Sequence, residues 1–128
     1  KPTGSFGEVG AFSFNGNKVV TSGGGGAITT NNVELGERAK FLTTTAKQPH
    51  AYEYVHNELG YNFRMPNLNA ALACAQLEQL DTFLQNKREL ANAYADFFEL
   101  QGIKFRKETP NTKANYWLMA VELENKED

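Results

Sequence analysis

The stretch VGAFSFNGNKVVTSGGGGAITT, residues 9–30, contains the elements that decide the fold. Residues 9–14 are rich in aromatic and apolar side chains, which predicts a short strand. The Asn-Gly-Asn turn that follows tolerates positive φ angles and ends this strand. Four consecutive glycines then precede a second strand-like run at residues 27–30. The stretch therefore predicts a hairpin-like pair of strands whose connection carries Lys18.

Beyond this hairpin, hydrophobic periodicity and turn residues predict an alternation of helix, loop and strand. The predicted elements are a helix at 33–45 capped by Asn31 or Asn32, an irregular loop at 48–65, a long helical stretch at 68–100 that bends near 81–82 and ends at Gly102, and strands at 103–106 and 115–123. This order indicates an α/β protein.

Composition excludes several classes of function. The chain has 128 residues and a formal net charge of -2, which provides no basic surface for nucleic acid or an anionic membrane. No apolar run is long enough to cross a bilayer, and no signal-peptide core is present, so we expect a cytoplasmic protein. The single cysteine, Cys74, excludes an internal disulfide. His50 and His56 lack the spacing of a metal motif, so no metal is expected.

Three further expectations concern packing. The neighbours of Cys74 are alanines in a helical pattern, which predicts a buried thiol. Tyr116 and Trp117 are expected as core aromatics. The charged run at residues 87–89 is expected to form a solvated helix face.

Lys18 is the residue that suggests chemistry. It lies in a tight turn after a strand, and the glycines behind it would let a phosphate or a planar ligand approach the backbone. Two chemistries fit, a nucleotide-phosphate loop and a Schiff-base lysine of a pyridoxal phosphate (PLP) enzyme. The nucleotide loop requires Ser or Thr after the lysine, where this chain has Val19. From spacing alone, a surface lysine in a glycine-rich hairpin remains the simpler interpretation.

Two motifs resemble a known family. Residues 4–30 are similar to the lysine loop of the DegT/DnrJ/EryC1/StrS sugar aminotransferases. The run Glu-Leu-Gly-Tyr-Asn-Phe-Arg-Met at 58–65, with the alanine-rich segment that follows it, resembles a second hallmark of the same family. The segments at 66–69 and 115–118 are most similar to the branch that acts on UDP-linked 4-keto-6-deoxy amino sugars.

The resemblance implies part of a fold-type-I PLP-dependent transferase of the α/β class. In that fold, residues 1–66 would be the C-terminal part of the PLP-binding large domain. Residues 67–101 would form the connecting helix region, and residues 102–128 would begin the small C-terminal domain. Both ends of the chain are then expected to be internal points of a longer protein, with the aspartate for the pyridine nitrogen upstream of residue 1.

The resemblance also assigns roles to particular residues. Lys18 is implied to be the catalytic Schiff-base lysine, and Ser13 to donate a hydrogen bond to the cofactor phosphate. Asn62 is implied to reach the phosphate held by the neighbouring subunit, so that a homodimer shares its active sites. Arg64 is a candidate for a substrate phosphate or carboxylate, with a structural salt bridge as the alternative.

The implied reaction is transfer of an amino group from an amino acid, expected to be glutamate, to a nucleotide-linked 4-keto sugar. Relatives that dehydrate sugars carry histidine at the lysine position, so Lys18 favours transamination. Two alternatives remain at this point: a catalytically incomplete fragment or interaction module with the same fold, and a phosphate-binding domain of another class.

Overall fold

The computed structural model describes residues 1–125 and divides into two compact units. The first unit comprises residues 1–17 and 21–74, and the second comprises residues 18–20 and the chain from residue 75 onward. The connection between the two hairpin strands therefore contributes residues to both units.

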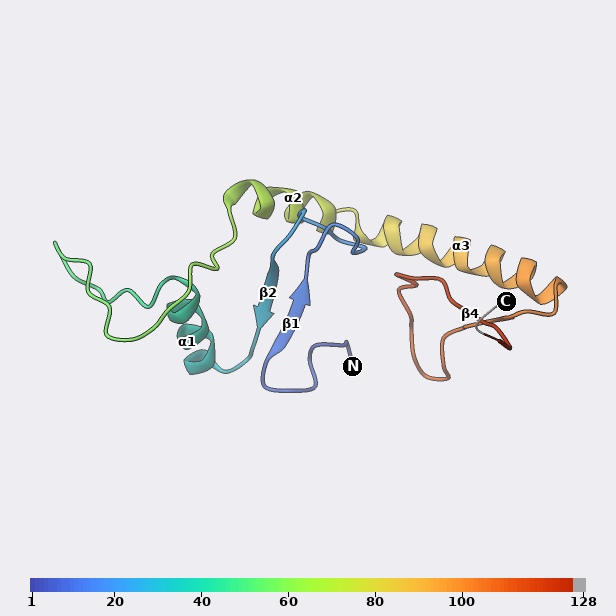
Figure 1. The fold of residues 1–128 in the computed structure, drawn as a ribbon, viewed down its shortest axis with the longest axis horizontal. Coiled ribbons are helices and arrows are strands. Elements are labelled where there is room, and N and C mark those ends of the chain that lie inside the picture. Colours follow the sequence, from blue (N-terminus) through green and yellow to red (C-terminus); the bar gives the residue numbers. More distant parts are fainter. Residues whose placement is uncertain (126–128) are drawn as a thin grey trace. The chain divides into compact units, whose positions relative to one another are not determined.

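The predicted hairpin is confirmed. Strands β1 (Gly10–Ser13) and β2 (Gly26–Thr29) pair antiparallel, as the two arrows of Figure 1 show. The register places Ser13 opposite Gly26. Strand β2 thus starts on the last glycine of the run, one residue earlier than predicted. A Cβ atom there would collide with the Phe12 carbonyl oxygen, so this position requires glycine.

Helix α1 (Val33–Thr43) begins where the sequence predicts it. The Asn32 side chain accepts a hydrogen bond from the Leu35 N–H at 3.2 Å, which satisfies a donor of the first helical turn. The helix ends two residues earlier than predicted, because Thr45 and Ala46 adopt φ angles of 70° and 51°. A left-handed backbone cannot continue an α-helix.

The long helical stretch is divided into α2 (Asn67–Leu77) and α3 (Leu80–Leu100). The break falls at residues 78–79, earlier than the predicted bend. The expectation that Cys74 is buried is wrong, because its side chain is exposed. On α2 the buried residue is Ala73, and adjacent helical positions point about 100° apart, which turns Cys74 outward.

Helix α3 ends as predicted at Gly102, whose φ is 71°. The Ile103 N–H donates to the Phe98 carbonyl at 2.9 Å and the Gly102 N–H donates to the Glu99 carbonyl at 3.0 Å. This pair of bonds is a Schellman motif, and glycine adopts its left-handed C′ position without a Cβ penalty.

The core of the second unit lies between α3 and a short hairpin. Strands β3 (Lys104–Phe105) and β4 (Val121–Glu122) pair antiparallel. Ala91, Ala95 and Phe105 are buried together, and the side chains packed against them are Phe98, Tyr116, Met119 and Val121. The predicted strand at 115–123 is too long, since Tyr116 has a φ of 46° and interrupts any extended run.

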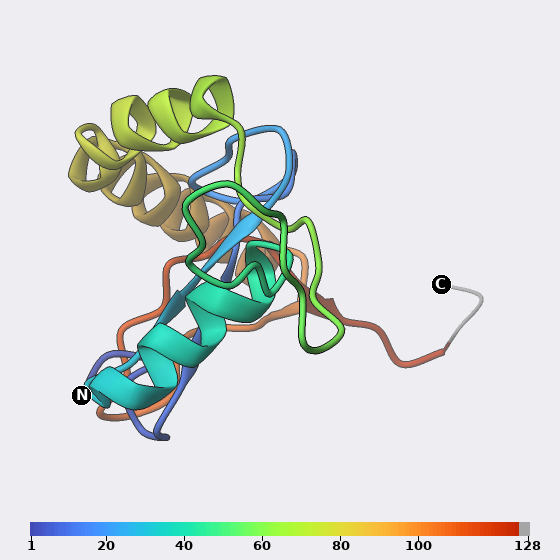
Figure 2. The ribbon, with the colours of Figure 1, turned by 90° about the vertical axis from the view of Figure 1, so that its left-hand side faces the viewer.

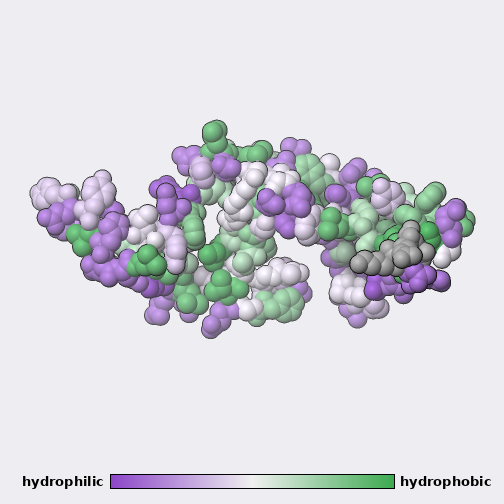
Figure 3. All heavy atoms as spheres, viewed as in Figure 1, coloured by the Kyte–Doolittle hydropathy of each residue, from purple (hydrophilic) through white to green (hydrophobic). Residues whose placement is uncertain are grey.

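Apolar side chains remain on the surface of the β1–β2 hairpin, where Figure 3 shows green atoms. Val9, Phe12 and Ile28 keep between 43% and 53% of their surface exposed. An isolated two-stranded hairpin is marginally stable, so this face is one that further protein would stabilise by covering it. Among residues 1–125, no helix is long and apolar enough to cross a membrane.

Candidate functional site

The turn before Lys18 is built on the end of β1. The Ser13 hydroxyl oxygen accepts a hydrogen bond from the Asn15 N–H at 3.4 Å, and the Asn15 amide donates to the Asn17 side-chain oxygen at 3.3 Å. The Ser13 side chain itself is exposed to solvent. Local hydrogen bonds of this kind are why serine and asparagine favour turns. The turn therefore has a defined shape immediately before the candidate lysine.

The chain after Lys18 folds back onto Phe14. The Ser22 N–H donates to the Phe14 carbonyl at 3.0 Å, and the Phe14 N–H donates to the Gly25 carbonyl at 2.9 Å. Gly23 and Gly25 have φ angles of 78° and 82°, which only glycine adopts without strain. The glycine run is therefore required for the backbone path between β1 and β2.

The second sequence motif packs against this glycine run. The Asn69 side-chain amide donates to the Ser22 carbonyl at 2.6 Å, and Ser22 is only 1% exposed. A Cβ atom placed on Gly25 would lie 3.0 Å from the Met65 methyl carbon. Two motifs far apart in the sequence are thus in direct contact within the first unit, and the pattern of residues alone contained no signal for this contact.

Lys18 clusters with the second unit. Its side chain is half-buried, and its ammonium nitrogen lies 3.5 Å from the centroid of the Trp117 ring. Trp117 was expected in the core, but it is only half-buried and its ring faces Lys18. The sequence contained no local signal for this contact, because the two residues are far apart along the chain.

Asn62 lies beside the end of α1 with its side chain exposed. It forms an isolated bridge with Thr44, and the N–H groups of its neighbours Tyr61 and Phe63 donate to the Leu42 and Thr43 carbonyls at 2.7 and 2.9 Å. Figure 1 shows the loop between α1 and α2 extending beyond α1 before it returns to this point, and Figure 2 gives the view turned by 90°, with this loop facing the viewer. The backbone around Asn62 is therefore anchored, while its amide remains accessible.

Close backbone packing between Gly60 and residues 45–46 fixes the same loop. Ala46 is fully buried, and a Cβ atom on Gly60 would collide with the Ala46 and Thr45 backbone. The His56 ring nitrogen Nδ1 lies 2.8 Å from the Thr45 carbonyl oxygen and is positioned to donate to it. Glycine at position 60 is thus required by close backbone approach.

Glu58, at the start of the second motif, is paired with Arg38 of α1. Both guanidinium nitrogens donate to the two carboxylate oxygens at 2.5 Å. The hydrogen bonds from Arg38 lower the pKa of Glu58 below its ordinary value. This bidentate pair joins α1 to the motif, and it was not predicted.

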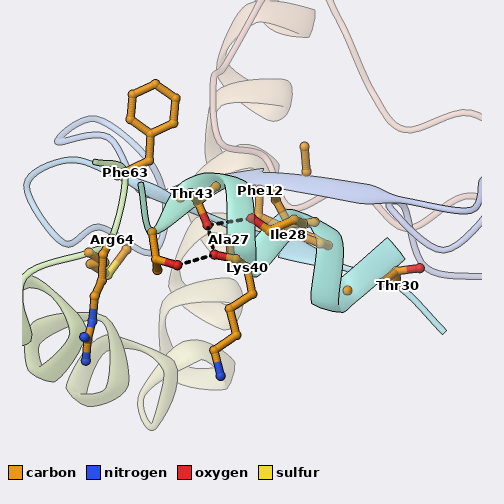
Figure 4. A pocket seen from close by; sticks show the side chains of 15 residues that line it. Phe12, Ala27, Ile28, Thr30, Lys40, Thr43, Phe63 and Arg64 are labelled. Atoms are coloured by element: carbon orange, nitrogen blue, oxygen red, sulfur yellow. Dashed lines mark hydrogen bonds between the residues drawn. The ribbon is translucent and has the colours of Figure 1, made fainter. Parts of the chain in front are cut away.

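Arg64 lines a pocket of about 890 Å³ between the hairpin and α1. The wall is largely apolar and includes Phe12 and Ile28. Figure 4 shows the Arg64 and Lys40 side chains extending in the same direction, so two cationic groups lie on one side of the pocket. Within residues 1–125 no carboxylate pairs with Arg64, so the structural salt bridge considered as its alternative role is not formed there.

The expectation that residues 87–89 form a solvated helix face is wrong for Arg88, whose side chain is partly buried. Arg88 donates to both carboxylate oxygens of Glu108, at 3.1 and 2.7 Å, and to the Ala114 carbonyl at 2.7 Å. These hydrogen bonds lower the pKa of Glu108 to about 2. The pair holds the segment that precedes Trp117 against α3. In the part of the chain that the structure describes, no cluster of His, Cys, Asp and Glu could hold a metal ion.

Comparison with known proteins places this geometry in a family. A model described as the DegT/DnrJ/EryC1/StrS aminotransferase family matches residues 1–128. The EpsN protein of Bacillus subtilis (strain 168), whose name assigns it provisionally to the PLP-dependent aminotransferases, is 39% identical over 126 residues, covering 98% of this chain and 32% of EpsN. The GDP-perosamine synthase of Escherichia coli O157:H7 is 37% identical over 121 residues, covering 94% of this chain and 33% of the synthase.

The fold agrees with this relationship. The structure of Helicobacter pylori PseC, described as an aminotransferase involved in the biosynthesis of pseudoaminic acid, superposes with a TM-score of 0.86 and 27% identity, covering 94% of this chain and 33% of PseC. The expectation of part of an α/β PLP-dependent transferase fold is thus confirmed. The chain spans about a third of the length of the curated relatives it matches. A match over the whole chain, two relatives above 30% identity and the shared fold lead to one conclusion: the chain belongs to the DegT/DnrJ/EryC1/StrS aminotransferase family.

Proposed function

We propose that the protein containing this chain is a PLP-dependent aminotransferase that transfers an amino group from an amino acid, glutamate in our proposal, to a nucleotide-linked 4-keto sugar. The observation that carries the proposal is the contact between the lysine-bearing hairpin and the second motif, through Asn69 and Ser22, in a member of the sugar aminotransferase family. This contact supports a preformed loop in which a lysine, a hydroxyl and a glycine-rich backbone occur together.

The residues present fit PLP. Its aldehyde requires an amine, and Lys18 supplies one; its phosphate requires fixed donors, and Ser13 and Asn62 supply a hydroxyl and an amide without adding charge. A Cβ atom on Gly24 would meet nothing within 4 Å, so the backbone there is open to a ligand. These residues thus match the aldehyde and the phosphate of the cofactor.

Lys18 is the residue that acts on the reacting atoms. Lys18 would hold the cofactor covalently, and in its free form its amine would remove the proton from the amino-acid Cα and later return a proton. Bound PLP supplies an electron-accepting ring for this proton transfer. The lysine must be neutral when it accepts the proton.

Asn62 and Arg64 complete the proposed site. We place Asn62 at the cofactor phosphate of the partner subunit, so that a homodimer contains two shared sites. Its exposed amide on an anchored backbone supports this role. Arg64 is proposed to pair with an anionic group of the substrate, which suits a planar guanidinium on the cationic side of an apolar pocket.

We also propose domain boundaries for this chain and a nucleotide for its sugar substrate. Residues 1–66 are assigned to the large domain, 67–101 to the connecting helix region and 102–128 to the start of the small domain. The sequence resemblance favours a UDP-linked sugar, whereas three relatives are named for a GDP-linked product. The substrate test therefore includes both nucleotides.

The experiment uses the full-length protein. Incubation with PLP followed by borohydride reduction and peptide mass mapping should place the pyridoxyl group on Lys18. Glutamate with UDP- or GDP-linked 4-keto-6-deoxy sugars should then yield the amino sugar and 2-oxoglutarate. A pyridoxyl group on Lys40 or Lys47, or amino-sugar formation that survives Lys18→Ala, would refute the assignment.

A further inference from the structure

The Lys18–Trp117 contact has the geometry of a cation–π interaction. The ammonium nitrogen lies 3.5 Å from the ring centroid, well inside the range of about 6 Å at which the negative face of an indole attracts a cation. Both side chains are half-buried, so water screens the attraction less than at an exposed site. The ring therefore contributes to holding the lysine head group in one place.

The ring is held by a turn with several supports. The Trp117 N–H donates to the Asn115 side-chain oxygen at 3.0 Å. The Tyr116 hydroxyl accepts from the Glu108 N–H at 3.2 Å, and its ring packs against the core of the second unit. Glu108 also accepts from the Ala114 N–H at 2.7 Å. These bonds fix the backbone on both sides of Tyr116, and the Trp117 side chain extends from this fixed backbone.

We propose that Trp117 is a positioning residue that holds the Lys18 side chain whenever the lysine is not bonded to a carbonyl. The inference rests on the proposed role of Lys18 as the cofactor-binding lysine. A lysine side chain is long and flexible, so it samples many rotamers when nothing holds it. In the proposed reaction the amine would be freed and bound again in every cycle. A fixed resting position would keep it oriented towards the reacting atoms and so lower the entropic cost of each step.

Two substitutions distinguish an effect of the aromatic ring face from an effect of side-chain volume. Phenylalanine keeps a ring face with a weaker attraction for cations than tryptophan, whereas leucine is apolar but has no ring. Trp117→Phe should therefore retain part of the effect, and Trp117→Leu should lose it. A role limited to packing would not follow this order.

The test measures the accessibility of each lysine in the full-length protein after PLP has been removed. A short pulse of an acetylating reagent, followed by mass spectrometry of peptides, reports the labelling rate at each lysine. We expect labelling of Lys18 to rise by at least about 2- to 5-fold in Trp117→Leu, which is the range for an exposed contact, because this contact is half-buried. Trp117→Phe should give a smaller rise.

A second lysine provides the matched control. The Lys47 ammonium lies 3.8 Å from the centroid of the Tyr54 ring in the first unit. Tyr54→Leu should raise labelling of Lys47 and leave Lys18 unchanged, while Trp117→Leu should do the reverse. Equal rises at both lysines in Trp117→Leu, an unchanged Lys18, or identical results for Phe and Leu would each overturn the proposal.

Borohydride trapping of PLP on Lys18 shows whether a negative result concerns the role of Trp117 or the proposed function of Lys18. Borohydride trapping of PLP on Lys18 together with unchanged acetylation in Trp117→Leu would reject only the role of Trp117. Altered acetylation of Lys18 without trapping of PLP on it would reject the proposed function, and the Lys18–Trp117 contact would then be structural.

Discussion

The Asn69 side-chain amide donates a hydrogen bond to the Ser22 carbonyl oxygen at 2.6 Å, across 47 residues of sequence. Ser22 lies in the loop that carries Lys18, and Asn69 lies in the first turns of α2. The bond therefore joins the glycine-rich connection to the motif that contains Asn62. Since the Ser22 residue is buried, water does not readily replace Asn69 as the donor.

Replacing Asn69 by leucine should destabilise the protein by about 1–3 kcal/mol, because the buried carbonyl loses its donor. It should also weaken PLP binding, since the loop between Ser22 and Gly26 is no longer fixed. Chemical denaturation and PLP titration of the full-length protein measure the two effects. Asn92→Leu, at an exposed position of α3, is the control and should change stability by less than about 0.5 kcal/mol. Equal losses in both variants would show that the bond contributes nothing specific.

Gly60→Ala should destabilise the loop that presents Asn62. The new Cβ atom would collide with the Ala46 and Thr45 backbone, where neither side can yield as a flexible side chain would. Overpacking of this kind costs about 1–3 kcal/mol. At Gly16 a Cβ atom meets nothing within 4 Å, so Gly16→Ala is the matched control. Denaturation midpoints that fall equally in the two variants would contradict the close approach at Gly60.

The free energy of unfolding should decrease in acid, because protonation of the Glu108 carboxylate removes its interaction with Arg88. The hydrogen bonds from Arg88 lower the pKa of this carboxyl from 4.5 to about 2 in the folded protein. A carboxyl with a depressed folded-state pKa stabilises the fold above its unfolded pKa, and the contribution is lost as the pH falls from about 4.5 towards 2. The free energy of unfolding measured between pH 6 and 2 should therefore decline less steeply in Glu108→Gln. Glu78→Gln, at an exposed position, should keep the wild-type slope.

The sequence predicts local features well and long-range features poorly. The hairpin, the Asn32 cap and the Gly102 stop depend on neighbouring residues, and all three are present. The break between α2 and α3 has no glycine or proline to signal it, so the periodic pattern continued across it. The Asn69–Ser22 bond and the Lys18–Trp117 contact depend on tertiary folding, which composition and periodicity do not report.

In the proposed homodimer, each site combines Lys18 of one subunit with Asn62 of the other. Asn62→Asp would replace an amide donor with a carboxylate beside the cofactor phosphate, at a cost on the order of 2–3 kcal/mol in cofactor binding. Lys18→Ala removes the catalytic amine. Each homodimer of either variant should therefore be impaired at both sites.

Mixing the two full-length variants creates a dimer with one doubly altered site and one site that has both native residues. Because one of the two sites has both native residues, activity should return to about half that of the wild type per mixed dimer. Subunit exchange is verified by mass labelling of one variant. Asn57→Asp, a change of the same type at an exposed position of the same loop, should keep full activity as a homodimer, which controls for damage to the loop itself. If exchange occurs and the mixed dimers remain inactive, Asn62 acts within its own subunit or away from the cofactor, because only a residue contributed across the dimer can be complemented by the partner.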